Sequence, residues 1–136
     1  MKPQTVMIID DDADDRFFFQ EAVSRLPSIK QTHICDSGSQ ALALLQDSKT
    51  GMPDYIFLDL NMPLMNGKEC LIELKKILCE KFTQIIILST SDLKQDIDDV
   101  MELGAKLFLT KPNTFEGLYN MLKSVLEGRW HRKSLT

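Results

Sequence analysis

The sequence predicts an α/β fold: a doubly wound, five-stranded parallel sheet with helices on both faces. Two observations lead to this expectation. Five short runs of continuously apolar residues recur along the chain, and an amphipathic helical pattern follows each of them. Continuous apolar runs are typical of parallel strands buried on both faces, and strands that alternate with helices form right-handed βαβ units. Of the common doubly wound arrangements we expect the strand order 2-1-3-4-5.

The first half of the chain contains three expected strands and two helices. The strands are residues 6–9, 33–35 and 55–58. After the first strand, one apolar stripe at helical spacing is expected to face the sheet: Phe18, Phe19, Ala22, Val23 and Leu26. Pro27 closes this helix. Ser37 followed by Gln40 has the form of a capping box, which predicts the start of the second helix.

The second half repeats this rhythm. Asn66 followed by Glu69 again has the form of a capping box and predicts the start of the third helix. The fourth and fifth strands are expected at residues 85–88 and 107–109. Gly104 is expected to end the fourth helix, because glycine readily adopts the left-handed conformation at a helix C-terminus. The last helix should stop near residue 128.

Length and composition are those of a small globular domain. With 136 residues, of which 43% are hydrophobic, we expect one domain at residues 1–128, a short basic tail at residues 129–136, and no output domain. The net charge of −4 argues against a chain dedicated to binding nucleic acid. No apolar run approaches the roughly 18 residues of a membrane span, and the N-terminus lacks the pattern of a signal peptide.

The three cysteines indicate a reducing compartment. Cys35, Cys70 and Cys79 are odd in number and show no CxxC spacing, so we expect small core side chains rather than a disulfide or a metal site. The sequence therefore predicts a soluble, cytoplasmic protein that does not contact a membrane.

Reactive side chains follow four of the five expected strands at the points where those strands end. They are Asp10 and Asp11, then Asp59, then Ser89 with Thr90, and finally Lys111. The carboxyl ends of parallel strands share one edge of the sheet, and ligands of such sheets bind there. Three carboxylates placed together repel one another, and a cation relieves that repulsion.

The chemistry of this set indicates a phosphoryl site. A hard divalent cation, Mg²⁺, suits it better than zinc, because no histidine or cysteine follows these strands. A lysine ammonium suits phosphate oxygens, and a hydroxyl donates a hydrogen bond to another oxygen. Asp59 is then placed to act as a carboxylate nucleophile.

The other acids of the first loop have a simpler interpretation. Asp12, Asp14 and Asp15 come just before a helical pattern, and acidic side chains favour helix N-termini, so we expect them to cap the first helix. Lys111 or Ser89 alone would be an ordinary surface or strand-end residue. Their joint occurrence, each at a different strand end, favours the functional interpretation.

Six short segments also carry a family resemblance. They are residues 8–12 (IIDDD), 58–63 (LDLNMP) with 65–67 (MNG), 88–90 (LST), 104–105 (GA) and 109–112 (LTKP). With them the chain resembles the receiver domain of two-component response regulators, from about residue 5 to residue 127. The resemblance implies a flavodoxin-like fold.

The resemblance further implies a phosphoacceptor that works with Mg²⁺. Asp59 would accept a phosphoryl group from a phosphohistidine of a sensor kinase or phosphotransfer protein. Mg²⁺ would be held by Asp10, Asp11, Asp59 and the backbone carbonyl of Asn61. Lys111 would pair with the phosphoryl oxygens.

A conformational switch is also implied. Ser89 would turn toward the phosphoryl group and Phe108 would follow it inward, changing the surface of the fourth helix, the fifth strand and the fifth helix for a downstream protein partner. Two residues depart from the common pattern. Phe108 stands where many relatives carry tyrosine, and Thr90 stands where a smaller residue is common and narrows access to the site.

An enzyme is the alternative. A phosphatase of the haloacid dehalogenase type would use Asp10 as nucleophile and Asp12 as acid. Such enzymes generally also need an acidic pair after the lysine, which Glu116 alone does not supply after Lys111, and this interpretation leaves Asp59 unexplained. We therefore expect a signalling protein that is not an enzyme. A receiver-like module that takes no phosphate is disfavoured, because every reactive position is filled.

Three further expectations concern partners and local geometry. Phe17, at the edge of the first helix's apolar stripe, is expected to contact the phosphodonor. The Lys111–Pro112 peptide bond is expected to be cis, as the resemblance implies. In a homodimer, the basic tail with Trp130 would contact an acidic face formed by Asp96, Asp98, Asp99 and Glu102.

Overall fold

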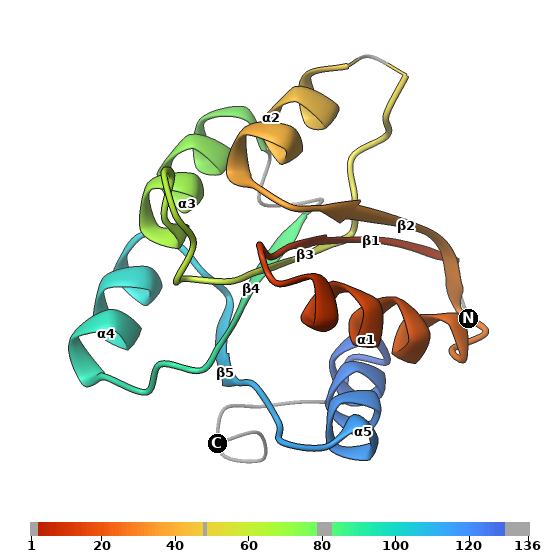
Figure 1. The fold of residues 1–136 in the computed structure, drawn as a ribbon. Coiled ribbons are helices and arrows are strands. Elements are labelled where there is room, and N and C mark those ends of the chain that lie inside the picture. Colours follow the sequence, from red (N-terminus) through yellow and green to blue (C-terminus); the bar gives the residue numbers. More distant parts are fainter. Residues whose placement is uncertain (1–2, 48, 79–82, 130–136) are drawn as a thin grey trace.

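Strands and helices alternate along the chain in the computed structural model, which describes residues 3–47, 49–78 and 83–129 (Figure 1). The strands are β1 (Gln4–Ile9), β2 (Ile29–Cys35), β3 (Tyr55–Leu58), β4 (Gln84–Ser89) and β5 (Leu107–Thr110). The helices are α1 (Ala13–Ser24), α2 (Gly38–Gln46), α3 (Gly67–Ile77), α4 (Lys94–Glu102) and α5 (Phe115–Leu126). The predicted α/β class and element order are confirmed.

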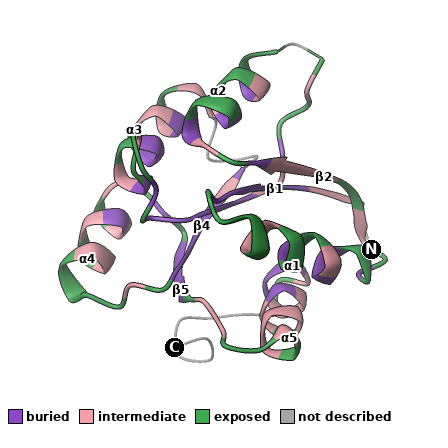
Figure 2. Ribbon diagram, viewed as in Figure 1, coloured by how far each residue is buried: buried purple, intermediate pink, exposed green. Residues whose placement is uncertain are grey.

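The sheet is parallel throughout, and its strand order is β2-β1-β3-β4-β5, as expected. Helices α1 and α5 lie on one face, whereas α2, α3 and α4 lie on the other (Figure 1). The central strands are buried along most of their length, and the outward sides of the helices are exposed (Figure 2). None of the helices in the described part of the chain has the length and apolar content to cross a membrane.

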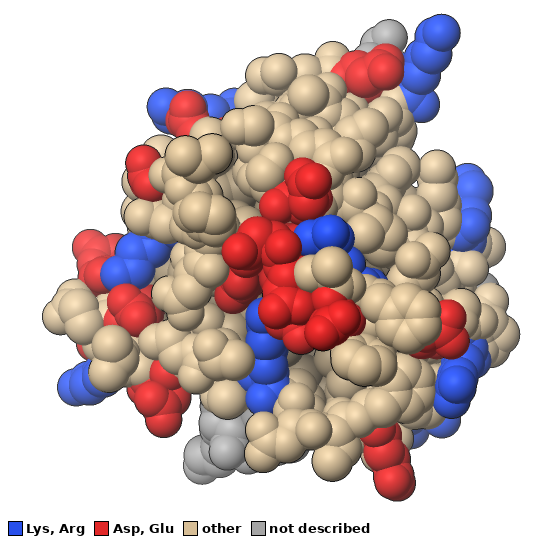
Figure 3. Space-filling model, in the orientation of Figure 1, with Lys and Arg blue, Asp and Glu red and all other residues tan. Residues whose placement is uncertain are grey.

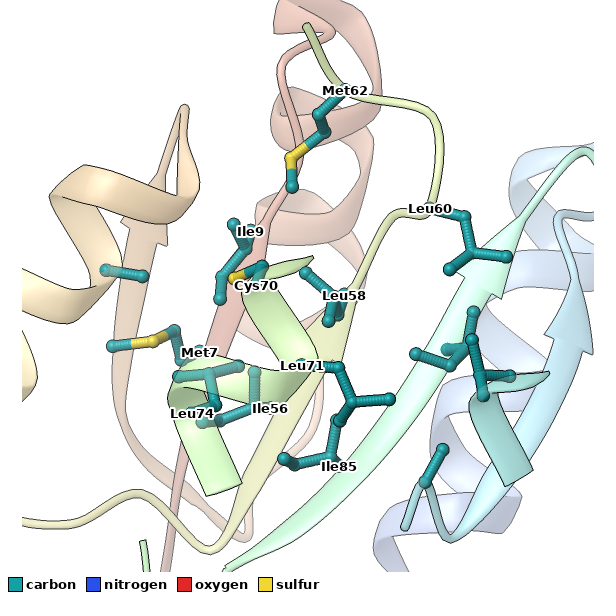
Figure 4. Packing of buried hydrophobic residues seen from close by; sticks show 14 of the residues in the cluster. Met7, Ile9, Ile56, Leu58, Leu60, Met62, Cys70, Leu71, Leu74 and Ile85 are labelled. Carbon is teal, nitrogen blue, oxygen red and sulfur yellow. The ribbon is translucent and has the colours of Figure 1, made fainter. Parts of the chain in front are cut away.

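Side chains of the central strands alternate between two hydrophobic cores. On β1, Val6 and Ile8 face α1 and α5, whereas Met7 and Ile9 face the side covered by α2, α3 and α4. Figure 4 shows the core on the side of α2, α3 and α4, in which strand residues pack against Cys70, Leu71 and Leu74 of α3. Each fully buried side chain of this size contributes about 1.5–3 kcal/mol. Two covered faces therefore explain why the strand sequences are continuously apolar.

Helix starts agree with the predicted caps. The Asp12 carboxylate accepts hydrogen bonds from the backbone of Asp14 and Asp15 at the start of α1. Asn66 and Glu69 form both hydrogen bonds of the capping box at α3. At α2 the box is incomplete, because the Gln40 side chain accepts from Asp36 instead of from Ser37. Gly104 and Gly128 both adopt a positive φ, as expected for residues that follow a helix.

The structure corrects two details of the expected elements. Strand β2 begins at Ile29, four residues earlier than predicted, because pairing with β1 includes the polar residues Gln31 and Thr32. Phe18, which was assigned to the buried stripe of α1, is 46% exposed. The face of α1 that packs on the sheet consists of Phe19, Ala22 and Val23, and Phe18 falls to one side of it.

Cysteine usage agrees with the prediction where the structure describes it. Cys35 and Cys70 are free and buried. Burial raises the pKa of the Cys35 thiol to about 11 and that of Cys70 to about 12, so both are protonated and unreactive near neutral pH. Cys79 and most of the basic tail, including Trp130, lie outside the described residues.

Candidate functional site

The strand-end residues predicted from the sequence meet at one edge of the sheet. The strands are in register there, since Ile9 pairs with Leu58 and Leu58 pairs with Ile87. The residues just beyond these pairs are therefore neighbours in space. On the molecular surface, acidic and basic atoms gather near the start of α1, at the centre of the view (Figure 3).

Three carboxylates form the centre of this site. Asp10, Asp11 and Asp59 each offer an oxygen, and these oxygens lie within 4.8 Å of one another. Asp10 is 2% and Asp59 5% exposed, whereas Asp11 faces solvent. Asp59 is fixed by a backbone hydrogen bond from its N–H to the carbonyl of Ile9, 3.0 Å long, which continues the ladder between β1 and β3.

The buried carboxylates are reluctant to ionise. Burial raises the pKa of Asp59 to about 6, and the charges of Asp10 and Asp11 add to this effect, while Lys111 opposes it. Burial likewise raises the pKa of Asp10, against hydrogen bonds from Lys111 and from the Asp12 backbone. Carboxylate oxygens that converge in this way fit a hard cation such as Mg²⁺, which would neutralise the repulsion.

Lys111 supplies the positive charge of the site. Its ammonium nitrogen lies 2.9 Å from Asp10 Oδ2, 2.7 Å from Asp15 Oδ2 and 3.7 Å from Asp59 Oδ1. Burial alone lowers the pKa of this lysine, but the hydrogen bonds to Asp15 and Asp10 more than offset it and raise the pKa above its usual value. Lys111 is therefore charged near neutral pH.

The sequence interpretation missed the role of Asp15. It was expected to cap α1, but Asp12 is the cap, and the Asp15 carboxylate forms an ion pair with Lys111 instead. Helical spacing could have indicated this contact. Asp15 lies one turn after the strand-end acids, on the side of α1 that faces the β5–α5 loop, where Lys111 begins that loop.

Ser89 is fully buried at the end of β4 and begins a chain of polar contacts. Its hydroxyl oxygen accepts hydrogen bonds from the Ser91 N–H, at 3.2 Å, and from the Asn61 side-chain amide, at 3.5 Å. The Ser91 hydroxyl donates to the carboxylate of Asp96 in the first turn of α4. Lys68 of α3 pairs with the other oxygen of Asp96 at 2.8 Å. The contacts thus link the site to the position of α4.

The acidic face proposed for the tail is partly occupied. Lys68 also pairs with Asp99 at 2.8 Å, so two of the four acids on α4 already have a basic partner in α3. Hydrogen bonds from Lys68 lower the pKa of both Asp96 and Asp99. Asp98 and Glu102 are exposed.

Phe108 and the Lys111–Pro112 bond differ from the expectations. Phe108 is only 8% exposed and packs in the core with Val100 and Ala105, so it already occupies an inward position. Unlike tyrosine, phenylalanine has no hydroxyl group that would favour an outward, solvent-exposed position.

The predicted cis Lys111–Pro112 bond is wrong, because no described peptide bond is cis. The trans isomer is the ordinary preference of X–Pro bonds, and with it Lys111 still reaches Asp10.

Gly67 allows α3 to approach the site closely. A β-carbon at this position would come within 2.6 Å of the Asp59 carbonyl oxygen and 2.4 Å of the Leu60 α-carbon. The Gly67 N–H also donates to the Leu60 carbonyl at 2.8 Å. The glycine of the MNG segment is therefore required by packing against the strand end that carries Asp59.

A cavity of about 270 Å³ opens beside Lys111. Its wall includes Asp15 and Phe18 from α1 together with Pro112 from the β5–α5 loop. Phe17, 57% exposed, contacts Phe18 edge to face with ring centroids 5.6 Å apart. Phe17 is thus accessible, as contact with a phosphodonor requires, and Phe18 extends the same apolar surface; the contact itself stays a prediction.

The family comparison decides between the interpretations. A model of the response regulator receiver domain matches residues 6–123. The chain belongs to this family. It is therefore a response regulator receiver domain of two-component signalling, as the sequence resemblance implied.

Individual receiver proteins are similar over nearly the whole chain. Response regulator Rcp1 of a Synechocystis strain is 28% identical over 132 residues, which cover 94% of this chain and 89% of Rcp1. The response regulator ARR6 of Arabidopsis thaliana is 30% identical, with 92% and 70% covered. The Escherichia coli nitrate/nitrite response regulator NarL is 31% identical, but the chain spans only 56% of its length.

Solved receiver structures share the fold. The phosphorylated cyanobacterial phytochrome response regulator RcpA has a TM-score of 0.82 at 27% identity, with 92% of both chains covered. The Mn²⁺-bound form of Rcp1 has a TM-score of 0.76 at 27% identity, with 90% of this chain and 91% of that one covered. A receiver of similar structure thus binds a divalent cation, which agrees with the carboxylate cluster of this chain.

The phosphatase alternative finds no support in the geometry. That interpretation needs Asp12 as a free acid facing the site, but its carboxylate oxygen accepts hydrogen bonds from two backbone N–H groups of α1. Asp10, the nucleophile of that alternative, pairs with Lys111 and lies beside the carboxylate of Asp59.

The raised pKa of Asp59 leads to a prediction about stability. The native state holds a proton on Asp59 up to about pH 6, whereas the unfolded chain releases it near 3.8, so metal-free stability falls as pH rises between these values. At pH 7.5 without metal, Asp59→Asn should therefore be more stable than the wild type, by at most about 3 kcal/mol. Urea denaturation measures the difference.

The pH profile supplies the control for that measurement. As the pH falls below 3.8 the advantage of Asp59→Asn should shrink toward zero, because Asp59 then becomes protonated in the unfolded chain as well. Adding Mg²⁺ at pH 7.5 should also narrow the gap by stabilising the wild type. A constant difference at every pH would show that the asparagine changes packing rather than charge.

Proposed function

We propose that this receiver is a phosphoacceptor whose reactive group is the Asp59 carboxylate. The observation that carries the proposal is the position of Asp59: it is buried, adjoins two further carboxylates, and lies 3.7 Å from the Lys111 ammonium. Asp10 lies at a strand end in the same cluster, but its carboxylate is already engaged by Lys111 at 2.9 Å. Family membership supports the same assignment.

The reaction is a phosphoryl transfer. An Asp59 carboxylate oxygen attacks the phosphorus of the donor, a new P–O bond forms, and the bond between phosphorus and the donor's imidazole nitrogen breaks. The leaving nitrogen keeps the electron pair. Lys111 is placed to pair with a phosphoryl oxygen, and the Ser89 hydroxyl to donate to another after a rotation.

Mg²⁺ is the expected cofactor. Asp10, Asp11 and Asp59 would hold it through carboxylate oxygens, and the backbone carbonyl of Asn61 would complete the protein ligands. When bound, the ion supplies charge stabilisation to the transferring phosphoryl group. Its charge would offset the repulsion between the buried carboxylates of Asp10 and Asp59.

The donor is a histidine kinase or a histidine phosphotransfer protein, and the domain itself acts as a signalling module rather than as an enzyme with its own substrate. A donor must reach Asp59 along the edge of the sheet, past α1 and the β5–α5 loop. The exposed ring of Phe18 lines the cavity beside Lys111, and the exposed ring of Phe17 contacts it edge to face. Aromatic side chains of this kind are enriched at the centres of interfaces.

Phe17→Ala should slow transfer from the cognate histidine donor by about fivefold or more, because an interface aromatic is lost. Labelling by acetyl phosphate, which needs no docking surface, should be unchanged. Leu93→Ala, which removes a similarly exposed side chain at the start of α4, is the matched control. Equal losses with both donors would indicate a folding defect instead.

The output is a change at α4. Once Ser89 turns toward a phosphoryl oxygen, its contact with the Ser91 N–H is lost, and Ser91 holds Asp96 of α4. A downstream partner would then recognise the altered surface of α4, β5 and α5. Because Phe108 is already buried, this proposal relies on the Ser91 and Asp96 contacts rather than on movement of that ring.

The test is covalent labelling. Incubation with acetyl phosphate and Mg²⁺ should add one phosphoryl group, about 80 Da, to the intact protein. The adduct should be stable in acid and labile in base, as an acyl phosphate is. Chelation of the metal before incubation should nearly abolish the mass gain. A metal-independent or base-stable adduct would contradict the proposal.

A further inference from the structure

Lys111 is shared among three carboxylates, and its shortest contact is not with the phosphoacceptor. The ammonium nitrogen lies 2.7 Å from Asp15, 2.9 Å from Asp10 and 3.7 Å from Asp59. Hydrogen bonds are formed with the first two. In this arrangement the ammonium lies closer to Asp15 and Asp10 than to Asp59.

Asp15 differs from Asp10 in what else it does. Asp10 belongs to the carboxylate cluster in which a metal ion would share its charge, whereas Asp15 is not part of that cluster. Asp15 does not cap α1 either, since Asp12 does so. Its carboxylate is 39% exposed at the wall of the cavity beside Lys111. The ion pair with Lys111 is therefore the interaction through which the Asp15 side chain would affect the site.

We propose that Asp15 is a positioning residue that competes for Lys111 and so slows phosphorylation of Asp59. To pair with phosphoryl oxygens, Lys111 must give up part of its contact with Asp15. The Asp15 charge also faces the side from which an anionic donor enters. The inference rests on the proposed function of Asp59.

The chain offers a matched control for this charge. Asp14 lies next to Asp15 in the first turn of α1, is exposed, and forms no ion pair with Lys111. Asp14→Asn and Asp15→Asn therefore remove the same charge from the same helix terminus. Only the second variant removes an ion-pair partner of Lys111. Any effect of net charge or of the helix dipole should therefore be the same in Asp14→Asn and Asp15→Asn.

The first experiment measures the rate of phosphoryl uptake from acetyl phosphate with saturating Mg²⁺, by intact mass. Asp15→Asn should react about two- to fivefold faster than the wild type, as expected for loss of a partly exposed ion pair. Asp14→Asn should react at the wild-type rate, and Asp15→Glu should restore slow uptake. An unchanged or slower Asp15→Asn, or an equal gain in Asp14→Asn, would overturn the inference.

The second experiment uses binding instead of reaction. Beryllofluoride mimics a phosphoryl group on a carboxylate, and calorimetry measures its affinity with Mg²⁺ present. Asp15→Asn should bind beryllofluoride about two- to fivefold more tightly than the wild type and Asp14→Asn do. Equal affinities would contradict the competition between Asp15 and the phosphoryl group for Lys111.

If the wild type takes up no label at Asp59, the proposed function itself fails. If it is labelled at Asp59 and Asp15→Asn matches it, the competition alone fails.

Discussion

Asp59→Asn should eliminate phosphorylation by both a histidine donor and acetyl phosphate. An amide oxygen is a much weaker nucleophile than a carboxylate oxygen. The substitution also removes one carboxylate from the cluster of Asp10, Asp11 and Asp59 that would hold the cation. We expect no mass gain under conditions that label the wild type fully. Intact-protein mass spectrometry gives the result directly.

Two controls separate this effect from a loss of folding. Asp98→Asn makes the same change of charge on the exposed side of α4 and should be labelled like the wild type. Asp59→Asn itself should remain folded, since its metal-free form is expected to be at least as stable as the wild type. Uptake of phosphate by Asp59→Asn at the wild-type rate would mean that another residue is the acceptor.

Lys111→Ala should have the second largest effect. The substitution removes the cation that pairs with Asp10 and lies 3.7 Å from Asp59, so charge on the transferring group loses a preorganised partner. Loss of such a group typically slows a reaction by about 10²- to 10³-fold. The rate of labelling by acetyl phosphate with Mg²⁺ measures the loss.

Lys94→Ala is the control for that variant, because Lys94 is an exposed lysine in the first turn of α4. It should be labelled at the wild-type rate. Metal-free Lys111→Ala should also melt at a lower temperature than the wild type, since two buried carboxylates lose their counter-ion. Normal labelling of Lys111→Ala would remove the lysine from the proposed mechanism.

Much of the fold could be predicted because the apolar pattern of each central strand matches its burial in the sheet. Residues 6–9 are apolar at every position, and both faces of β1 are covered by helices. A continuously apolar strand therefore indicates a sheet with helices on both faces. The same regularity places Asp10 and Asp59 at one edge. Strand β2 was predicted too short because it lies at the sheet's edge, where pairing with β1 tolerates polar side chains such as Gln31 and Thr32.

The details that the sequence did not predict depend on contacts between distant segments. The ion pair of Asp15 joins residues 96 positions apart, and an acid in the first turn of a helix has an adequate local explanation. Phe18 has the spacing of a core residue, yet the way α1 packs on the sheet turns its ring outward. The cis bond was inferred from resemblance alone, and the ordinary preference for trans prevails.

The most direct test of the central claim is to identify the phosphorylated residue. The protein is labelled with acetyl phosphate and Mg²⁺, the acyl phosphate is reduced with borohydride to a stable alcohol, and the digested peptides are sequenced by tandem mass spectrometry. We predict that the modified side chain is Asp59 and that Asp10 and Asp12 are unmodified. Modification at Asp10 instead would contradict the assignment and would favour the phosphatase-type nucleophile.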